Sequence, residues 1–136
     1  MIIEYKRCRD IEMKKIIQLF CNGGWSEDAD ELMLYNALQN TSHLVTAWDK
    51  NRVIGLIRSM DDDSYSATID VLIVDKQYQG KGIATALIKE LLKDLIHIKY
   101  ISVSPNESKN AALYERVGFK KIKEGVLLQI VNKESG

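Results

Sequence analysis

Two glycines, Gly80 and Gly82, stand where an apolar run gives way to a strongly patterned helix, in TIDVLIVDKQYQGKGIATALIKELL (68–92). Backbone N–H groups in the first turn of a helix lack an intrahelical acceptor, and the helix dipole attracts anions to them. Glycine removes side chains that would block a phosphate, and it permits positive-φ conformations that curl N–H groups into a concave nest. The turn at 79–85 therefore predicts a phosphate cradle, with added contacts from Lys81 and Thr85. A purely architectural role for the glycines, as a tight turn that lets the helix pack close to a sheet, stays open.

Two other phosphate-binding motifs do not match the amino-acid sequence of this turn. A Walker A loop requires GxxxxGK[ST], which the chain lacks. A dinucleotide fingerprint requires a third glycine or alanine, but Thr85 stands there, and no acidic residue lies in the region of Tyr100 where one is needed.

The elements around the turn predict a single α+β domain over 1–136, with a frayed tail at 132–136. Helices are expected over 11–20, 26–40, 83–95 and 108–117, with Leu32 and Met33 facing inward on the second. Three successive strands form a meander, and the strand after the long helix is a candidate for parallel pairing. We expect a mixed, mainly antiparallel sheet of about seven strands, flanked by four helices on both faces. The expected strands cover 1–7, 43–48, 52–60, 65–74, 99–104, 119–123 and 126–131.

The composition excludes several classes of protein. The 19 basic and 19 acidic side chains cancel, which argues against nucleic-acid binding through bulk charge and against a polybasic membrane anchor. The apolar runs are far shorter than the roughly 20 residues that span a bilayer. The start, MIIEYKRCRD, shows no signal-peptide pattern, so a cytoplasmic location is expected. His43 and His97 show no metal-ligand spacing, and we expect no metal.

Two blocks of this sequence resemble the GNAT acetyltransferase superfamily. VDKQYQGKGIA is similar to the central motif Gln/Arg-x-x-Gly-x-Gly/Ala, which falls on Gln79, Gly82 and Ala84. NAALYERVGFKK resembles the late helix and following strand of the family, with Tyr114 and Gly118 in their usual places. The expected order of elements agrees with that fold over nearly the whole chain.

This resemblance implies acetyl-coenzyme A as the acetyl donor. Family members hold the pyrophosphate on N–H groups of the glycine turn and pair the pantetheine arm with the splayed end of the fourth strand. A bulge in that strand would open its edge. Pro105 precedes Asn106, which matches a family asparagine less well because it stands one residue further from Tyr114 than usual; a plain turn asparagine stays open. The implied cofactor-binding residues are Leu72, Ile73, Val74, Gln79, Gly80, Lys81, Gly82, Ile83, Ala84, Thr85 and Asn106.

The implied reaction is direct transfer of the acetyl group to a primary amine of a small molecule or peptide. Tyr114 matches the family tyrosine that protonates the departing thiolate; otherwise it is a packed helix tyrosine with its hydroxyl in water. Relatives that place a glutamate on a strand have Thr68 or Ser102 here, so Asp70 is the remaining candidate for the base. A charge within an apolar strand needs a partner or an open cleft, and a pair between Asp70 and Arg58 is the alternative.

The acceptor is expected in a groove formed by the first two helices and their loop. Trp25 either walls that pocket or plugs the gap beneath the loop. Homodimers are common in the family, and no diagnostic surface stands out here. Two readings without catalysis stay open: an inactive acyl-CoA-binding regulatory module, and a structural domain. The absence of a glutamate on the strand leaves the first of these alternatives open.

Overall fold

The computed structural model describes residues 1–24, 30–105 and 108–132, without the side chains of 108 and 109. No helix in these ranges is long and apolar enough to cross a bilayer. The elements in chain order are β1 (Glu4–Lys6), α1 (Met13–Asn22), α2 (Glu31–Gln39), β2 (His43–Asp49), β3 (Arg52–Asp61), β4 (Ser66–Val74), the short 3-10 helix η1 (Lys76–Tyr78), α3 (Ile83–Asp94), β5 (Tyr100–Val103) and α4 (Ser108–Arg116).

The strands form one mixed sheet in the order β1-β2-β3-β4-β5. Neighbours are antiparallel except β4 and β5, which pair in parallel from Ser66 opposite Tyr100 to Ile69 opposite Val103. The mixed sheet and its parallel step are therefore confirmed.

The prediction of about seven strands is wrong for the described residues, because 119–123 and 126–131 carry no regular secondary structure. A strand needs a partner edge, and in this single chain neither segment reaches one.

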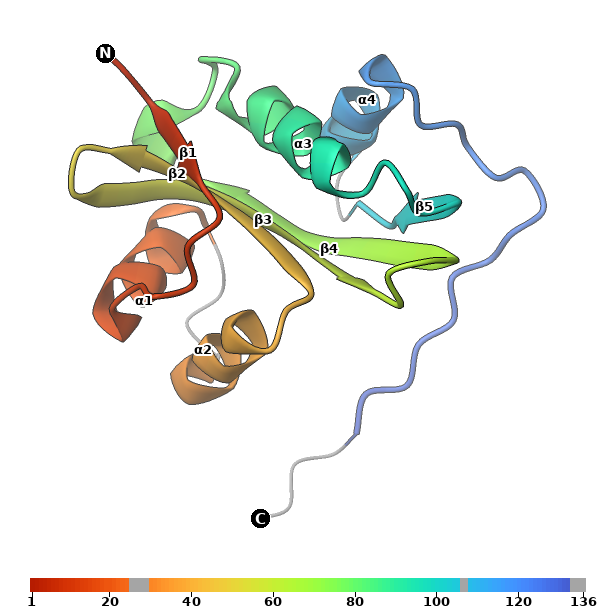
Figure 1. Ribbon diagram of the computed structural model, residues 1–136, viewed down its shortest axis with the longest axis horizontal. Coiled ribbons are helices and arrows are strands. Elements are labelled where there is room, and N and C mark those ends of the chain that lie inside the picture. The colour runs from red at the N-terminus through yellow and green to blue at the C-terminus, as the bar shows by residue number, and fades with distance from the viewer. Residues whose placement is uncertain (25–29, 106–107, 133–136) are drawn as a thin grey trace.

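Helices cover both faces of the sheet, as predicted (Figure 1). One core lies between the sheet and α3 and includes Ile54, Leu87 and Leu91. The other lies between the sheet and the first two helices and includes Leu19 and Leu56. The sheet is thus buried on both faces. Because β4 and α3 both contribute side chains to the first core, their relative position is fixed.

The second helix differs from its prediction. Its N-cap is Asp30, whose carboxylate accepts from the N–H of Met33 at 3.1 Å; the expected start of the helix at 26 lies outside the described residues. The predicted inward positions Leu32 and Met33 are 59% and 61% exposed, whereas Leu38 is buried. The helix carries two apolar stripes, and contact with α1 and the sheet selects the one that includes Leu38.

Strand β4 contains the expected bulge. Arg58 of β3 pairs with Val71, but the next residue of β3, Ser59, pairs with Ile69, so Asp70 is an extra residue on β4. Side chains in a strand alternate between faces, and one extra residue reverses the alternation. Ile69 therefore packs into the α3 core, while Val71 packs into the α1 core.

Candidate functional site

The turn between η1 and α3 forms a concave set of backbone N–H groups. Gly80 and Gly82 adopt φ angles of +78° and +82°, and Gly82 is the N-cap of α3. A Cβ placed on either glycine would meet nothing within 4 Å, so the space above the turn is open. Among the described residues, no hydrogen-bond acceptor faces the N–H groups of 80–85; the first helical bond runs from Ala86 to the Gly82 carbonyl. Six donors are therefore available to an anion.

The edge of β4 next to this turn is open over 70–74, because β5 ends at Val103 opposite Ile69. The N–H of Asp75 donates to Ile54 of β3 at 2.9 Å. Backbone polar groups of successive strand residues point to opposite sides, so those of Leu72 and Val74 face the open edge and those of Ile73 face β3.

The side chain of Gln79 closes part of this edge, because its amide donates to the Val74 carbonyl at 3.1 Å. Gln79 thus braces the turn against β4 with its side chain.

A cavity of about 750 Å³ brings the open edge, the turn and α4 together. Both predicted catalytic residues, Tyr114 and Asp70, line it. Lys81 is not among the lining residues, and Asn106 and Trp25 lie outside the described residues. The predicted cofactor-binding residues that line the cavity are Leu72, Ile73, Val74, Gln79, Gly80, Gly82, Ile83, Ala84 and Thr85.

Tyr114 projects from α4 into the cavity and is 3% exposed. Its ring packs edge-on against Phe119 at a centroid distance of 5.3 Å. Among the described residues its hydroxyl has no hydrogen-bond partner. Burial raises the pKa of this phenol well above its usual value, because the phenolate would lose its hydration. Tyr114 therefore keeps its proton at neutral pH and can donate it into the cavity.

Asp70 is held by Arg58, as the alternative interpretation predicted. Its two carboxylate oxygens accept from Nε and an Nη of Arg58, both at 2.8 Å. Arg58 is anchored further by the Thr41 hydroxyl at 3.2 Å. The Asp70 side chain is still 46% exposed, so lone pairs of its oxygens remain accessible to a cationic amine.

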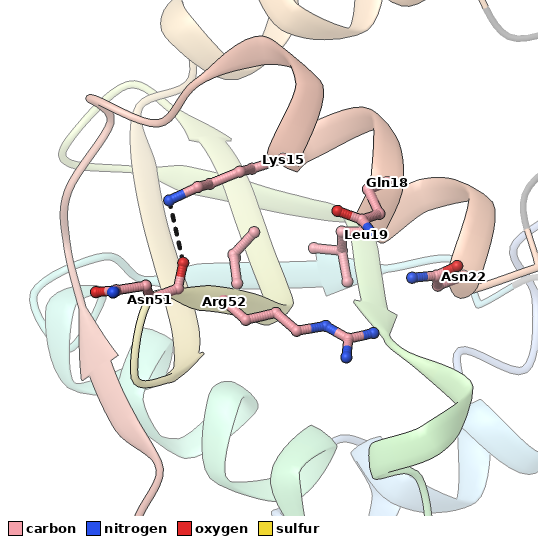
Figure 2. Close-up of a pocket in the computed structure, with 7 residues that line it drawn as sticks. Lys15, Gln18, Leu19, Asn22, Asn51 and Arg52 are labelled. Carbon is pink, nitrogen blue, oxygen red and sulfur yellow. Dashed lines mark hydrogen bonds between the residues drawn. The ribbon is translucent and has the colours of Figure 1, made fainter.

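A buried carboxylate, Asp75, ties the turn to the body of the protein. It caps η1 by accepting from the N–H of Gln77 at 2.9 Å, and it also accepts from Arg52 at 2.7 Å and Asn22 at 3.3 Å. Arg52 and Asn22 border a small hollow of about 130 Å³ between α1 and the β2–β3 hairpin (Figure 2). Across that hollow, Lys15 donates to the carbonyl of Asn51 at 3.1 Å. The start of the glycine turn is thus fixed by hydrogen bonds from α1 and β3.

The predicted site residues leave out several residues that line the cavity, among them Tyr78, Val103, Leu113 and Arg116. A Cβ on Gly23 would lie 2.3 Å from Cγ1 of Ile73, so only glycine lets the end of α1 approach β4 this closely. Gly23 and Gly24 begin the loop between the first two helices, where the sequence predicted the acceptor groove. Arg116 makes no ion pair with any described residue and supplies positive charge to the cavity wall; nothing in its sequence context distinguished it.

Comparisons with known proteins agree with this geometry. The family profile described as "Acetyltransferase (GNAT) domain" matches residues 18–127. The chain therefore belongs to the GNAT acetyltransferase family, as the two sequence blocks predicted.

Individual relatives point the same way. The chain is 28% identical over 123 residues to a probable acetyltransferase of Glycine max, which covers 81% of this chain and 49% of the relative. It is 32% identical over 73 residues to a probable spermine N(1)-acetyltransferase of Bacillus subtilis subsp. natto, covering 48% of each. The chain thus spans about half the length of these two curated relatives. A solved GNAT-family acetyltransferase from Streptococcus pneumoniae superposes with a TM-score of 0.81 at 26% identity, covering 98% of this chain and 100% of that one.

Proposed function

We propose that this protein is an N-acetyltransferase that moves an acetyl group from acetyl-coenzyme A directly to a primary amine of a small molecule or peptide. One observation carries the proposal: a turn with unpaired backbone N–H groups, an open strand edge and a buried, protonated tyrosine all border one cavity.

The residues present fit the donor. The N–H groups of 80–85 would hold its pyrophosphate, since the cradle is open where a Cβ would stand. The outward-facing backbone groups of Leu72 and the N–H of Val74 would pair with the amides of the pantetheine arm, as a peptide adds to a sheet edge, while the Val74 carbonyl accepts from Gln79. Arg116 would add electrostatic attraction for phosphate. When bound, the donor supplies an activated acetyl group as a thioester.

Two groups of the chain would handle protons. The phenol of Tyr114 lines the cavity, is protonated at neutral pH and would donate its proton toward the departing sulfur. Asp70 would receive the proton of the acceptor ammonium, directly or through a water, while Arg58 holds the carboxylate in place. Holding both substrates in one cavity supplies much of the acceleration through approximation.

The part of the cavity that Gly23, Gly24 and Asp70 border suits a cationic amine as the acceptor. Gly23 and Gly24 border it, which leaves backbone in place of bulky side chains, and Asp70 supplies negative charge there. The relative from Bacillus subtilis subsp. natto carries the name of an enzyme that acts on spermine, a polyamine, so polyamines belong in a first panel of acceptors.

Thermal unfolding with and without acetyl-coenzyme A tests donor binding. A ligand at 100 times its Kd adds about 2.7 kcal/mol to the free energy of unfolding, which corresponds to roughly 9 °C in Tm for a chain of this size. Turnover is then measured as free-thiol release over a panel of polyamines, arylalkylamines and peptides with lysine or a free N-terminus.

The possible outcomes separate the proposal from its alternatives. No Tm shift at millimolar acetyl-coenzyme A would leave only the structural domain. A Tm shift without turnover on any amine of the panel would instead identify an inactive acyl-CoA-binding module.

A further inference from the structure

The small hollow between α1 and the β2–β3 hairpin is rich in hydrogen-bond donors. It measures about 130 Å³, and two of its lining residues, Leu19 and Val53, are buried and apolar. In Figure 2 the polar lining residues of α1 extend toward the hollow, and Arg52 extends from the hairpin opposite them. None of the described residues that line it is acidic. The polar lining residues are two cations and three amides: Lys15, Arg52, Gln18, Asn22 and Asn51.

Arg52 is held in one position by its neighbours. One Nη donates to Asp75 at 2.7 Å, and the other donates to the side-chain oxygen of Gln77 at 3.4 Å. Its guanidinium also lies 5.6 Å from the centroid of the Tyr78 ring. Because the side chain is already ordered, it loses less conformational entropy when it binds a ligand. The Nε–H has no partner among the described residues and remains available as a donor.

The carboxylate of Asp75 does not line the hollow, and its side chain is 1% exposed. Its oxygens also accept from the N–H of Gln77 and from the amide of Asn22. Arg52 and Asp75 together are neutral, so Arg52 contributes donors to the hollow without net charge. The net positive charge of the lining therefore comes from Lys15.

Lys15 lies on the α1 side of the hollow and is partly buried. Its ammonium donates to the carbonyl of Asn51 at 3.1 Å and lies 5.8 Å from the centroid of the Trp48 ring. It makes no ion pair with any residue in the part of the chain that the structure describes. An ammonium has three donors, so Lys15 can still bind an anion while it holds Asn51. A partly desolvated cation without a carboxylate gains from such an anion.

We propose that this hollow binds a phosphate group, either free or at the end of a small phosphorylated molecule. Its donors lie on two opposite walls, with Lys15 and Gln18 on α1 and Arg52 on β3. The oxygens of a tetrahedral phosphate point in several directions and can meet both walls, whereas the two oxygens of a planar carboxylate point to one side. Lysine and arginine are both common phosphate binders. The site is separate from the glycine turn, because none of 79–85 lines it.

Two adjacent lysines of α1 provide the test. Lys15 lines the hollow, whereas the side chain of Lys14 is 84% exposed and does not line it. The full chain is titrated with inorganic phosphate at fixed ionic strength, so that general charge screening stays constant. Amide NMR spectra should show saturable shifts at 18–22 and 51–53. Lys15→Gln should raise the Kd for phosphate roughly 10-fold or more, because it removes a charge-assisted hydrogen bond, and Lys14→Gln should leave it nearly unchanged.

Gln18→Glu is a second variant that spares the fold, because Gln18 is exposed. It places a carboxylate in the hollow and should also raise the Kd roughly 10-fold or more through repulsion. Titrations with glycerol phosphate and with acetate complete the series. A lower Kd for glycerol phosphate than for inorganic phosphate would identify a phosphorylated molecule as the ligand, and the reverse order would identify free phosphate.

Three results would overturn the proposal: no saturable shift at 18–22 and 51–53, acetate binding as tightly as phosphate, or equal Kd values for Lys15→Gln and Lys14→Gln. Phosphate bound at the glycine turn would shift the amides of 80–85 instead, so the two sites are read separately. These titrations need no acetyl-coenzyme A or amine, so their failure is distinct from failure of the proposed acetyl transfer.

Discussion

The variant Gly82→Ala should affect both the stability of the fold and the binding of an anion, and the structure gives an expected size for each effect. An L-residue in the left-handed conformation costs roughly 1–2 kcal/mol, part of which is offset because alanine also restricts the unfolded chain. The added methyl meets no protein atom within 4 Å, so no clash adds to this cost. We therefore expect Gly82→Ala to lower the free energy of unfolding by about 1 kcal/mol.

The same methyl would occupy the space that an anion needs. A hydrogen bond to a charged group contributes about 1.5–3 kcal/mol, so losing one should weaken acetyl-coenzyme A binding by roughly 10- to 100-fold. Isothermal titration calorimetry measures the Kd, and urea unfolding measures the stability.

The matched control is Gly118→Ala. Gly118 also has a left-handed φ, +112°, and an added Cβ there would also meet nothing within 4 Å, but this residue does not line the cavity. Its stability should fall by a similar amount while its Kd stays near that of the wild-type protein. Equal Kd values for the two variants would refute the assignment of the glycine turn as the anion site.

Three further variants address the proton-handling groups and the base of the turn. Tyr114→Phe should lower kcat by roughly 100-fold or more and leave the Kd for acetyl-coenzyme A nearly unchanged; a parallel loss of both would contradict the acid role. The same variant bears on stability at alkaline pH. The unfolded chain loses the Tyr114 proton near pH 10 whereas the folded chain keeps it, so the free energy of unfolding should fall as pH rises above 10. That slope, measured by urea unfolding from pH 9.5 to 11, should be shallower in Tyr114→Phe. Asp70→Asn should reduce kcat/KM for the amine with little change in donor affinity, and the half-exposed position of the Asp70 side chain limits the stability loss to about 1 kcal/mol; unchanged turnover would remove Asp70 from the mechanism. Asp75→Asn should cost about 2 kcal/mol of unfolding free energy, because it weakens the hydrogen bonds of three donors to a buried acceptor, and a wild-type Tm would show that the turn does not depend on it.

Features set by local pattern were predictable from the sequence. The helix over 83–95 follows from strict apolar periodicity after the glycine turn, and the structure has α3 over Ile83–Asp94. The helix expected over 108–117 is α4 over Ser108–Arg116, and Gly118 follows it with a φ of +112°. The bulge in β4 was expected from the family resemblance, and it falls at Asp70.

Features set by distant contacts were not predictable in the same way. Which stripe of α2 faces inward depends on α1 and the sheet, so Leu32 was misassigned. Whether 126–131 forms a strand depends on an edge that another part of the fold, or another molecule, must supply. The close approach of Gly23 to Ile73 joins residues far apart in the chain, and no local pattern marks such a pair.

The bulge at Asp70 also has a consequence for insertions and deletions. Residues 71–74 lie on their present faces only because one surplus residue precedes them. Deleting that single position would turn Val71 and Ile73 from the α1 core toward α3, and would turn Leu72 and Val74 the other way. In β4, replacing one amino acid by another has a local effect. Removing the single residue between Ile69 and Val71 would instead move every side chain of 71–74 to the opposite face of the sheet. Chimeras that join this chain to a relative within β4 must therefore keep the number of residues in the strand, or change it only by an even number, whatever residues stand at the junction.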